Sequence, residues 1–272
     1  MQGEFIVDRL LPKIVREICD THNIDCAAFS DDWVLRLRKG DVTKWIIGYT
    51  FDINTSGSAG VANDKVATYE ALYAASVPAV EHYLAITRTS PHLLESNIAK
   101  IPSTSQVIAK PVSGGGGRYV TMLPTIDAAR KFLLDTADDE WSLSPYYDIV
   151  CETRVILLDQ KLLCCYQKSN PTIHDNLKMF NLGHGATATF MEPITKLLDL
   201  AKRAQQACNL RLCAVDIVTL NSGEDRVLEI NTGFAMEHFA RQSKEYHQKT
   251  FEVYETIVTT MMLEGSAAIS HP

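Results

Sequence analysis

The spacing of apolar and polar residues predicts helices and strand pairs from the start of the chain. Apolar residues recur at spacing four within residues 5–19, which predicts an amphipathic helix. Residues 33–38 alternate apolar and basic side chains, and after Gly40 an apolar run over 45–49 completes a predicted hairpin. The small, polar segment 54–60 then predicts a loop or linker and marks a domain boundary.

The rest of the chain continues this alternation of helices and strands. Strand pairs interleaved with helices predict an α+β fold with mostly antiparallel sheets. We expect a small N-terminal region over 1–62 and a larger domain over 63–272. The predicted helices are 63–76, 91–100, 125–136, 192–208 and 241–263; the predicted strands are 106–111, 119–122, 148–158, 161–167, 213–220 and 226–231, with a long polar loop over 168–190.

Oxygen-bearing side chains interrupt the apolar strands of the last predicted hairpin. Glu229 and Asn231 lie two residues apart in one strand, so both side chains leave the same face. A turn centred near Gly223 places Asp216 opposite about residue 230. Burying two carboxylates this close together is costly unless a cation lies between them. Oxygen ligands suit Mg2+, which commonly keeps phosphate oxygens as further ligands, so the hairpin predicts a Mg-nucleotide site.

Composition narrows the class of protein. The chain has 272 residues, of which 46% are hydrophobic and 22% are charged, as in ordinary globular proteins. A net charge of -7 argues against a general nucleic-acid-binding protein. The seven cysteines form no C-x-x-C pair, and we expect reduced, buried thiols. We recognise no signal peptide and no apolar run long enough to span a membrane, so we expect a cytoplasmic protein that binds neither membranes nor nucleic acid.

A glycine-rich loop is the second candidate for chemistry. Gly114 to Gly117 follow Ser113 and separate two predicted strands, and Lys110 ends the preceding strand. Glycine lets the backbone approach a ligand closely, and successive free N–H groups form an anion-binding concavity. The lysine precedes the loop and a strand follows it, so neither a Walker loop nor a Rossmann fingerprint fits. The pattern predicts a flap that covers phosphates.

Taken in order, these motifs resemble the ATP-grasp superfamily, in particular carboxylate–amine ligases of the bacterial glutathione synthetase and RimK-type peptide ligase kind. The resemblance covers about residues 63–263. It implies two α+β subdomains that clasp ATP, a lid and phosphate-loop half over 63–142 and a metal-binding half over 143–272. A short N-terminal α/β region would precede them.

The resemblance also implies a role for each matching residue. ATP would contact two lysines, the glycine loop, the interdomain hinge and a ribose-binding acid: Lys65, Lys110, Ser113, Gly114, Gly115, Gly116, Gly117, Tyr146, Tyr147, Glu152 and Lys178. Catalytic contacts would come from Arg154, Lys168 and Asn181. The metal ligands would be Asp216, Glu229 and Asn231, with ATP and Mg2+, or Mn2+ in its place, as the cofactors.

Several of these residues have a plainer alternative. Glu152 could pair with Arg154, its neighbour on one strand face, instead of binding ribose. Tyr146 and Tyr147 could pack in the core. Lys178 could be an ordinary lysine of a polar loop.

The implied function is an ATP- and Mg-dependent ligase that activates a carboxylate as an acyl phosphate and joins it to an amine. The partners would be small-molecule or peptide substrates, and the exposed hairpin of the N-terminal region is compatible with a homodimer. Two other functions stay open: a kinase of the same superfamily acting on a small hydroxyl acceptor, and a non-catalytic ATP-binding module. The chain departs from the family at 232–237, where a Ser-Pro-Gly-like turn is common, and at Lys168, where many members carry arginine.

Overall fold

The computed structural model describes residues 8–86, 91–136, 140–174 and 177–267. Its helices are α1 (Leu10–His22), α2 (Ser56–Asn63), α3 (Lys65–Ala74), α4 (Pro91–Ile98), α5 (Ile126–Asp135), α6 (Thr195–Ala207), α7 (Glu237–Ala240) and α8 (Lys244–Ala267), with a 3-10 turn η1 (Leu182–His184). Its strands are β1 (Asp25–Phe29), β2 (Val34–Lys39), β3 (Val42–Ile47), β4 (Thr50–Phe51), β5 (Tyr83–Ala85), β6 (Val107–Pro111), β7 (Thr121–Leu123), β8 (Trp141–Pro145), β9 (Ile149–Leu158), β10 (Lys161–Ser169), β11 (Thr172–His174), β12 (Leu177–Met179), β13 (Thr187–Phe190), β14 (Leu212–Leu220) and β15 (Asp225–Asn231).

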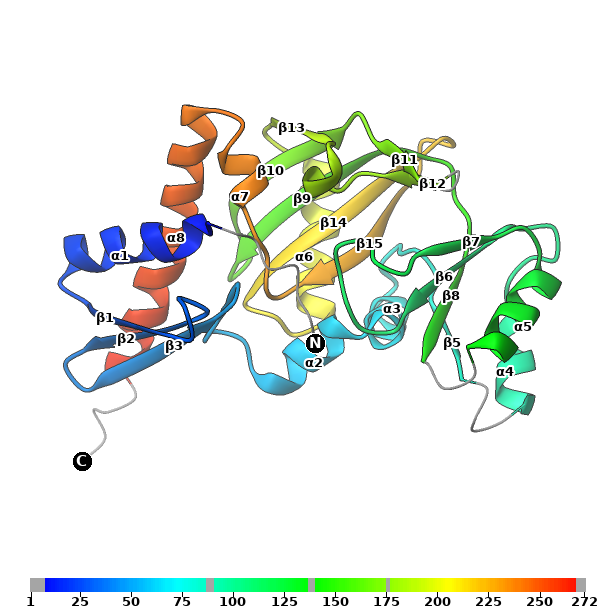
Figure 1. Ribbon diagram of the computed structural model, residues 1–272, viewed down its shortest axis with the longest axis horizontal. Helices are drawn as coiled ribbons and strands as arrows, with labels where there is room; N and C mark the ends of the chain where they lie inside the picture. Colours follow the sequence, from blue (N-terminus) through cyan, green and yellow to red (C-terminus); the bar gives the residue numbers. More distant parts are fainter. Residues whose placement is uncertain (1–7, 87–90, 137–139, 175–176, 268–272) are drawn as a thin grey trace.

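The strands form separate antiparallel sheets, which confirms the predicted α+β class. The central sheet has five strands in the order β13-β10-β9-β14-β15. Figure 1 shows it between two smaller sheets, β1-β2-β3-β4 of the N-terminal region and β5-β8-β6-β7 of the lid half. A pair of short strands, β11 and β12, makes up the fourth sheet.

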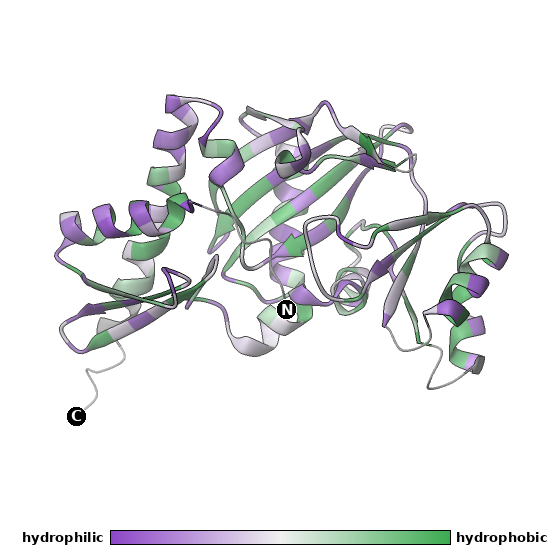
Figure 2. Cartoon of the chain, viewed as in Figure 1, coloured by the Kyte–Doolittle hydropathy of each residue, from purple (hydrophilic) through white to green (hydrophobic). Residues whose placement is uncertain are grey.

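The two faces of the central sheet pack on different partners. On one face, Val155, Leu157 and Val215 are fully buried in a core that includes α6. On the other face, Ile156 and Ala214 share a core with α1, α8 and the N-terminal strands. Because neighbouring residues of a strand point to opposite faces, these runs are apolar throughout. Figure 2 shows this hydrophobic colouring along the central strands.

The lid half has a core of its own. Val107 and Ala109 of β6, Leu143 of β8 and Leu133 of α5 are buried together. Thr125 caps α5, because its side chain accepts a hydrogen bond from the backbone N–H of Ala128.

The structure corrects two predictions about irregular segments. Residues 54–60 were predicted as a loop or linker, but helix α2 begins at Ser56 and is capped by the side chain of Thr55. The polar loop predicted over 168–190 contains strands β11, β12 and β13 and the turn η1. Both segments have few apolar residues, so their structure depends on contacts with distant parts of the chain.

The N-terminal region packs closely on the metal-binding half. Asn54 donates from its side chain to the carbonyl of Leu212 at 2.7 Å and accepts from the backbone N–H groups of Arg211 and Leu212. The predicted helix over 5–19 is found as α1, and residues 5–7 lie outside the described residues. The division at residue 62 stays a prediction.

Among the helices that the structure describes, none combines the length and the apolar character needed to cross a membrane.

Candidate active site

The central sheet aligns charged side chains across three strands. Arg154 on β9 lies directly opposite Asp216 on β14, and Asp216 lies opposite Glu229 on β15. Residues directly opposite each other in an antiparallel pair leave the same face. The predicted register, with Asp216 opposite about residue 230, is therefore correct to within one residue. Asn231 follows on the same face, two residues beyond Glu229.

Asp216 is the most heavily bonded side chain of this group. Arg154 donates to it with two nitrogens, Nε to Oδ1 at 2.7 Å and Nη2 to Oδ2 at 2.5 Å. Lys168 donates to Oδ1 and Asn231 donates to Oδ2, each at 3.2 Å. The Asp216 side chain is fully buried. Burial alone would raise the pKa of Asp216, but the charges of Arg154 and Lys168 outweigh it and hold the pKa well below its usual range.

Glu152 and Lys168 extend this network toward β10. They lie opposite each other across the β9–β10 pair, and Lys168 donates a short hydrogen bond to Glu152. Burial raises the pKa of Glu152, and the charge of Lys168 opposes that rise. Burial and Arg154 would lower the pKa of Lys168, but Asp216 and Glu152 outweigh them and raise it. Glu152 is thus paired with Lys168, whereas the sequence suggested Arg154 as its partner.

The predicted metal ligands lie close together in the structure. Asn231 donates from its amide to Glu229 at 3.1 Å as well as to Asp216. Two carboxylates and an amide are hard oxygen donors of the kind that Mg2+ prefers, and a half-turn of the amide would present its oxygen to the same point. The chemistry of this donor set therefore fits Mg2+. Within the described residues, no group of three or more His, Cys, Asp or Glu side chains could hold a metal ion. The site at Asp216 and Glu229 therefore needs the amide of Asn231 as its third ligand.

Two lysines of the lid half interact with the carboxylates of the sheet. Lys65 begins α3 and Lys110 lies on β6. Burial lowers the pKa of both lysines, and the charge of Glu229 partly offsets this in each. Lys110 in turn lowers the pKa of Lys65. Two partly desolvated ammonium groups close to each other favour a shared anionic ligand.

The glycine loop is held at both ends. Lys65 donates from Nζ to the carbonyls of Pro111 at 3.1 Å and Gly114 at 2.9 Å, which fixes the start of the loop. Gly116 and Gly117 have φ values of 73° and 70°, a left-handed conformation that favours glycine. His184 Nε2 lies 3.3 Å from the carbonyl oxygen of Gly116.

The other end of the loop meets the segment around Asn181. A Cβ atom at Gly117 would lie 3.4 Å from Asn181 Oδ1, so the loop backbone and this side chain are neighbours. Ser113 forms an isolated antiparallel bridge with Asp64, the N-cap of α3. The structure thus brings Lys65, the predicted phosphate loop and Asn181 together.

The predicted hinge residues have other partners. The Tyr147 hydroxyl donates to Glu81 at 2.7 Å and accepts from Arg226 at 2.8 Å, and the guanidinium lies 4.7 Å from the Tyr147 ring centre. Burial and Glu81 raise the pKa of Tyr147 to about 12. Tyr146 donates its backbone N–H to the carbonyl of Gln106 at 2.8 Å.

Lys178, also predicted to bind the nucleotide, is exposed and pairs with Asp148 at 2.7 Å. It also donates to the backbone carbonyl of Ile149. The nucleotide contacts assigned to Tyr146, Tyr147 and Lys178 stay predictions.

Sequence reasoning missed a buried histidine beside the lid lysines. His82 Nδ1 lies 2.8 Å from Ser142 Oγ and 2.9 Å from Ser144 Oγ. Burial, with the charges of Lys110 and Lys65, lowers the pKa of His82 well below its usual value, so the ring is neutral. Ser142 and Ser144 lie two residues apart in an apolar strand, the same spacing that identified Glu229 and Asn231. This spacing could have indicated a buried polar partner such as His82.

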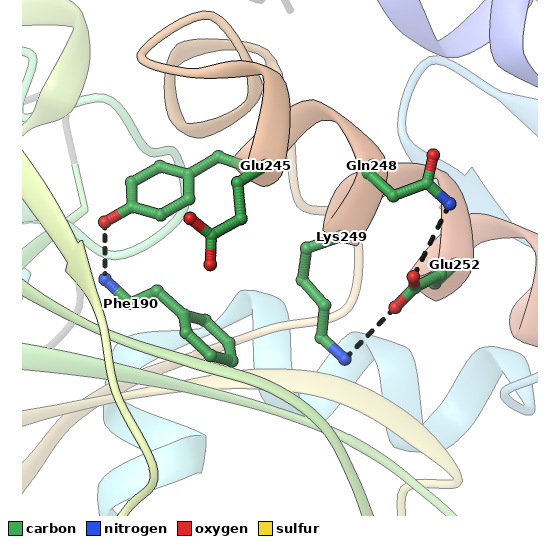
Figure 3. A pocket seen from close by; sticks show the side chains of 6 residues that line it. Phe190, Glu245, Gln248, Lys249 and Glu252 are labelled. Atoms are coloured by element: carbon green, nitrogen blue, oxygen red, sulfur yellow. Dashed lines mark hydrogen bonds and ion pairs between the residues drawn. The ribbon is translucent and has the colours of Figure 1, made fainter.

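A surface pocket opens elsewhere, between β13 and α8 (Figure 3). In it, the backbone N–H of Phe190 donates to the Tyr246 hydroxyl at 3.1 Å, and Lys249 pairs with Glu252 at 3.5 Å. None of the predicted site residues lines it; its residues are Phe190, Glu245, Tyr246, Gln248, Lys249 and Glu252.

Solved structures with the same fold are ATP-grasp ligases. The D-alanine–D-alanine ligase from Bacillus anthracis is 16% identical, with a TM-score of 0.57 over 78% of this chain and 72% of that one. D-cycloserine synthetase DcsG is 18% identical, with a TM-score of 0.57 over 73% and 70%. The ATP-grasp ligase PsnB is 18% identical, with a TM-score of 0.54 over 71% of this chain, and the match spans 60% of PsnB. At these identities the likeness shows the fold.

The sequence itself gives the family. No curated protein matches it significantly. The family profile of the RimK-like ATP-grasp domain matches residues 62–251, which include every residue predicted from the resemblance to bind ATP, metal or substrate. This match covers well over half of the chain, and it agrees with the antiparallel α+β architecture and with the structural neighbours. The chain belongs to the RimK-like ATP-grasp family.

Proposed function

We propose that this protein is an ATP- and Mg2+-dependent ligase that activates a carboxylate as an acyl phosphate and joins it to an amine. One arrangement carries the proposal: Lys65 holds the glycine loop by donating to the carbonyls of Pro111 and Gly114, and the central sheet aligns Arg154, Asp216 and Glu229. The charge of Glu229 also partly offsets the lowering of the pKa of Lys65 and Lys110 by burial. Cations on the lid and oxygen donors on the sheet suit a metal-bound triphosphate.

The proposed roles follow from the charges of the side chains. Lys65 and Lys110 would neutralise phosphate charge, and the loop Ser113–Gly117 would cover the phosphates with its backbone N–H groups. Asp216, Glu229 and Asn231 would hold Mg2+, or Mn2+ in its place, and the metal would supply further charge stabilisation. Arg154 would stabilise charge on the transferring phosphoryl group.

The reaction takes place in two steps. An oxygen of the acceptor carboxylate attacks the γ-phosphorus of ATP, ADP leaves, and an acyl phosphate forms. The amine nitrogen then attacks the acyl carbon, inorganic phosphate leaves, the nitrogen loses a proton and an amide results. Water would hydrolyse the acyl phosphate, so the glycine loop and Asn181 would serve to exclude it.

The substrates are proposed as amino acids or peptides. PsnB has been solved with a precursor peptide and with Mg and ADP, and the D-alanine–D-alanine ligase is an amino-acid ligase by name. In this chain, residues 232–241 follow the last metal ligand directly, and the bridge between Thr50 and Gly233 joins them to the N-terminal region. We propose that these two segments bind the acceptor.

The experiment is a screen of pooled amino acids and peptides with ATP and Mg2+. Ligation predicts inorganic phosphate and a condensed product, seen by mass spectrometry, only when both a carboxylate and an amine are present. Transfer to a hydroxyl acceptor would give ADP and a phosphorylated product, which supports the kinase alternative instead. ATP that binds but yields neither product would overturn both enzyme assignments.

A variant of Glu229 tests the metal assignment. Glu229→Gln should lower turnover by at least about a hundredfold, because Gln lacks the negative charge that a metal contact needs. ATP should still bind measurably, because Gln keeps the size of Glu229 and a hydrogen-bond acceptor. The matched control is Glu224→Gln in the exposed turn of the same hairpin, which should retain wild-type turnover. Turnover like that of the wild type in Glu229→Gln would refute this ligand set.

A further inference from the structure

The carboxylate of Asp216 has no acceptor capacity left. An ionised carboxylate offers about four lone-pair positions, two on each oxygen. Oδ1 accepts from Arg154 Nε and Lys168 Nζ, and Oδ2 accepts from Arg154 Nη2 and Asn231 Nδ2. Asp216 can therefore ligate a metal only if at least one of these donors moves away.

Asn231 adds a second obstacle. Its amide nitrogen donates to both Asp216 and Glu229, so the amide presents hydrogens, not its oxygen, to the two carboxylates. A cation bound between the two carboxylates would face the partial positive charge of these amide hydrogens. The arrangement holds together without a metal because Arg154 and Lys168 supply the positive charge.

The local balance of charge points the same way. Four carboxylates, Asp64, Glu152, Asp216 and Glu229, interact here with four cations: Lys65, Lys110, Arg154 and Lys168. A divalent ion added alone would leave an excess of positive charge in a largely buried place, which is unfavourable. A nucleoside triphosphate brings negative charge and gives the side chain of Arg154 an alternative anionic partner.

We propose that Arg154 and Lys168 act as internal substitutes for the metal and make divalent-metal binding conditional on nucleotide. Arg154 exchanges Asp216 for phosphate oxygens when the nucleotide arrives, and Asp216 becomes free to ligate the metal. This regulation rests on the proposed function, because it takes Asp216 as a metal ligand. It also gives Arg154 a role before any phosphoryl transfer.

Water-proton relaxation with Mn2+ as the probe tests the proposal directly, because Mn2+ held by protein relaxes water faster than free Mn2+ does. Wild-type protein should give little enhancement with Mn2+ alone and a clear one when ADP is added. Arg154→Met frees one acceptor position on each oxygen of Asp216 and should bind Mn2+ without nucleotide at least about tenfold more tightly than the wild type. Wild-type protein that binds Mn2+ alone as tightly as this variant would overturn the proposal.

The chain offers a closely matched control. Arg211 pairs with Asp159 through the same two nitrogens, at 2.8 and 2.6 Å, but on the exposed surface. Arg211→Met removes the same charge and should leave Mn2+ binding at the wild-type level. Adding Asp216→Asn to Arg154→Met should abolish the gain, and a gain that persists would show that Mn2+ binds elsewhere.

Two further measurements keep the outcomes distinct. Arg154→Lys retains the charge but lacks the planar pair of donors with which arginine bonds the two oxygens side by side. It should give a smaller gain in Mn2+ binding, and it is the variant to test if circular dichroism shows that Arg154→Met does not fold. ATP binding to wild-type protein in the presence of Mg2+ is measured separately. Its absence would contradict the proposed function, while the Mn2+ comparison would still decide whether Arg154 blocks Asp216.

Discussion

Asp216 stays charged in a fully buried position because two cations and an amide bond it. A carboxylate buried without them would be neutral, since desolvation raises its pKa. The sequence pattern found Asp216 and its register with Glu229, because both follow from a two-residue period and one turn. It did not find the pairing of Lys168 with Glu152 and Asp216, because that depends on the order of three strands.

Replacing this carboxylate tests how much the network contributes to folding. Asp216→Asn should lower the free energy of unfolding at pH 7 by about 3–5 kcal/mol, since Arg154 loses its buried carboxylate partner and Lys168 keeps only Glu152. Asp159→Asn at the exposed Arg211 pair should cost at most about 1 kcal/mol. Urea unfolding measures both, and equal losses would contradict this account.

The same variant predicts a pH dependence. The pKa of Asp216 is lower in the folded protein than in the unfolded chain, so its stabilising contribution is complete above the unfolded value, near about 4. It is lost as the pH falls through the still lower folded pKa. The stability difference between wild type and Asp216→Asn should therefore be constant from pH 7 to about 5 and shrink below about pH 4. A difference that grows on acidification would contradict the assigned direction.

At the scale of elements, predictions succeeded where the local pattern determines the structure. The hairpins β9–β10 and β14–β15 lie where apolar runs and short turns placed them. Helix α2 was missed because Ser56 to Gly60 are small and polar, and the helix depends on the Thr55 cap and on packing against α3 and β15. The sequence also did not predict the hydrogen bonds that join Tyr147, Glu81 and Arg226, because these residues come from three distant segments.

The glycine loop gives an element-scale prediction. Gly117→Ala should disfavour the observed loop conformation by at least about 1–2 kcal/mol, because alanine is strained at a φ of 70° and its Cβ would clash with Met179 Cε. The loop should then open more often, and trypsin should cleave after the exposed Arg118 faster than in the wild type. Gly115→Ala is the control, since a Cβ there meets nothing within 4 Å and no left-handed φ is required. Equal cleavage of the two variants would contradict the conformational requirement at Gly117.

At the scale of the whole molecule, the lid sheet and the central sheet pack in different cores. The lid sheet packs around Leu133 and Leu143, whereas Leu72 of α3, also in the lid half, packs in a core of the central sheet. The N-terminal region, α8 and the other face of the central sheet form a further core. The sequence suggested two lobes through the resemblance, but it gave no indication that the N-terminal residues complete the core of the metal-binding half. That packing joins α1 to α8, which are more than 200 residues apart in the chain.

This division into cores predicts how the protein opens. Ile18→Ala in α1 and Leu133→Ala in α5 each empty a fully buried position and should each cost about 2–5 kcal/mol. Hydrogen exchange should distinguish them, because local opening follows cooperative units. Ile18→Ala should reduce the protection of β14, whose Ala214 lies in the same core, whereas Leu133→Ala should reduce that of β6 and leave β14 unchanged. If Leu133→Ala weakens β14 as much as β6, the halves unfold as one unit, and closure of the lid over ATP could not be a motion of an independent body.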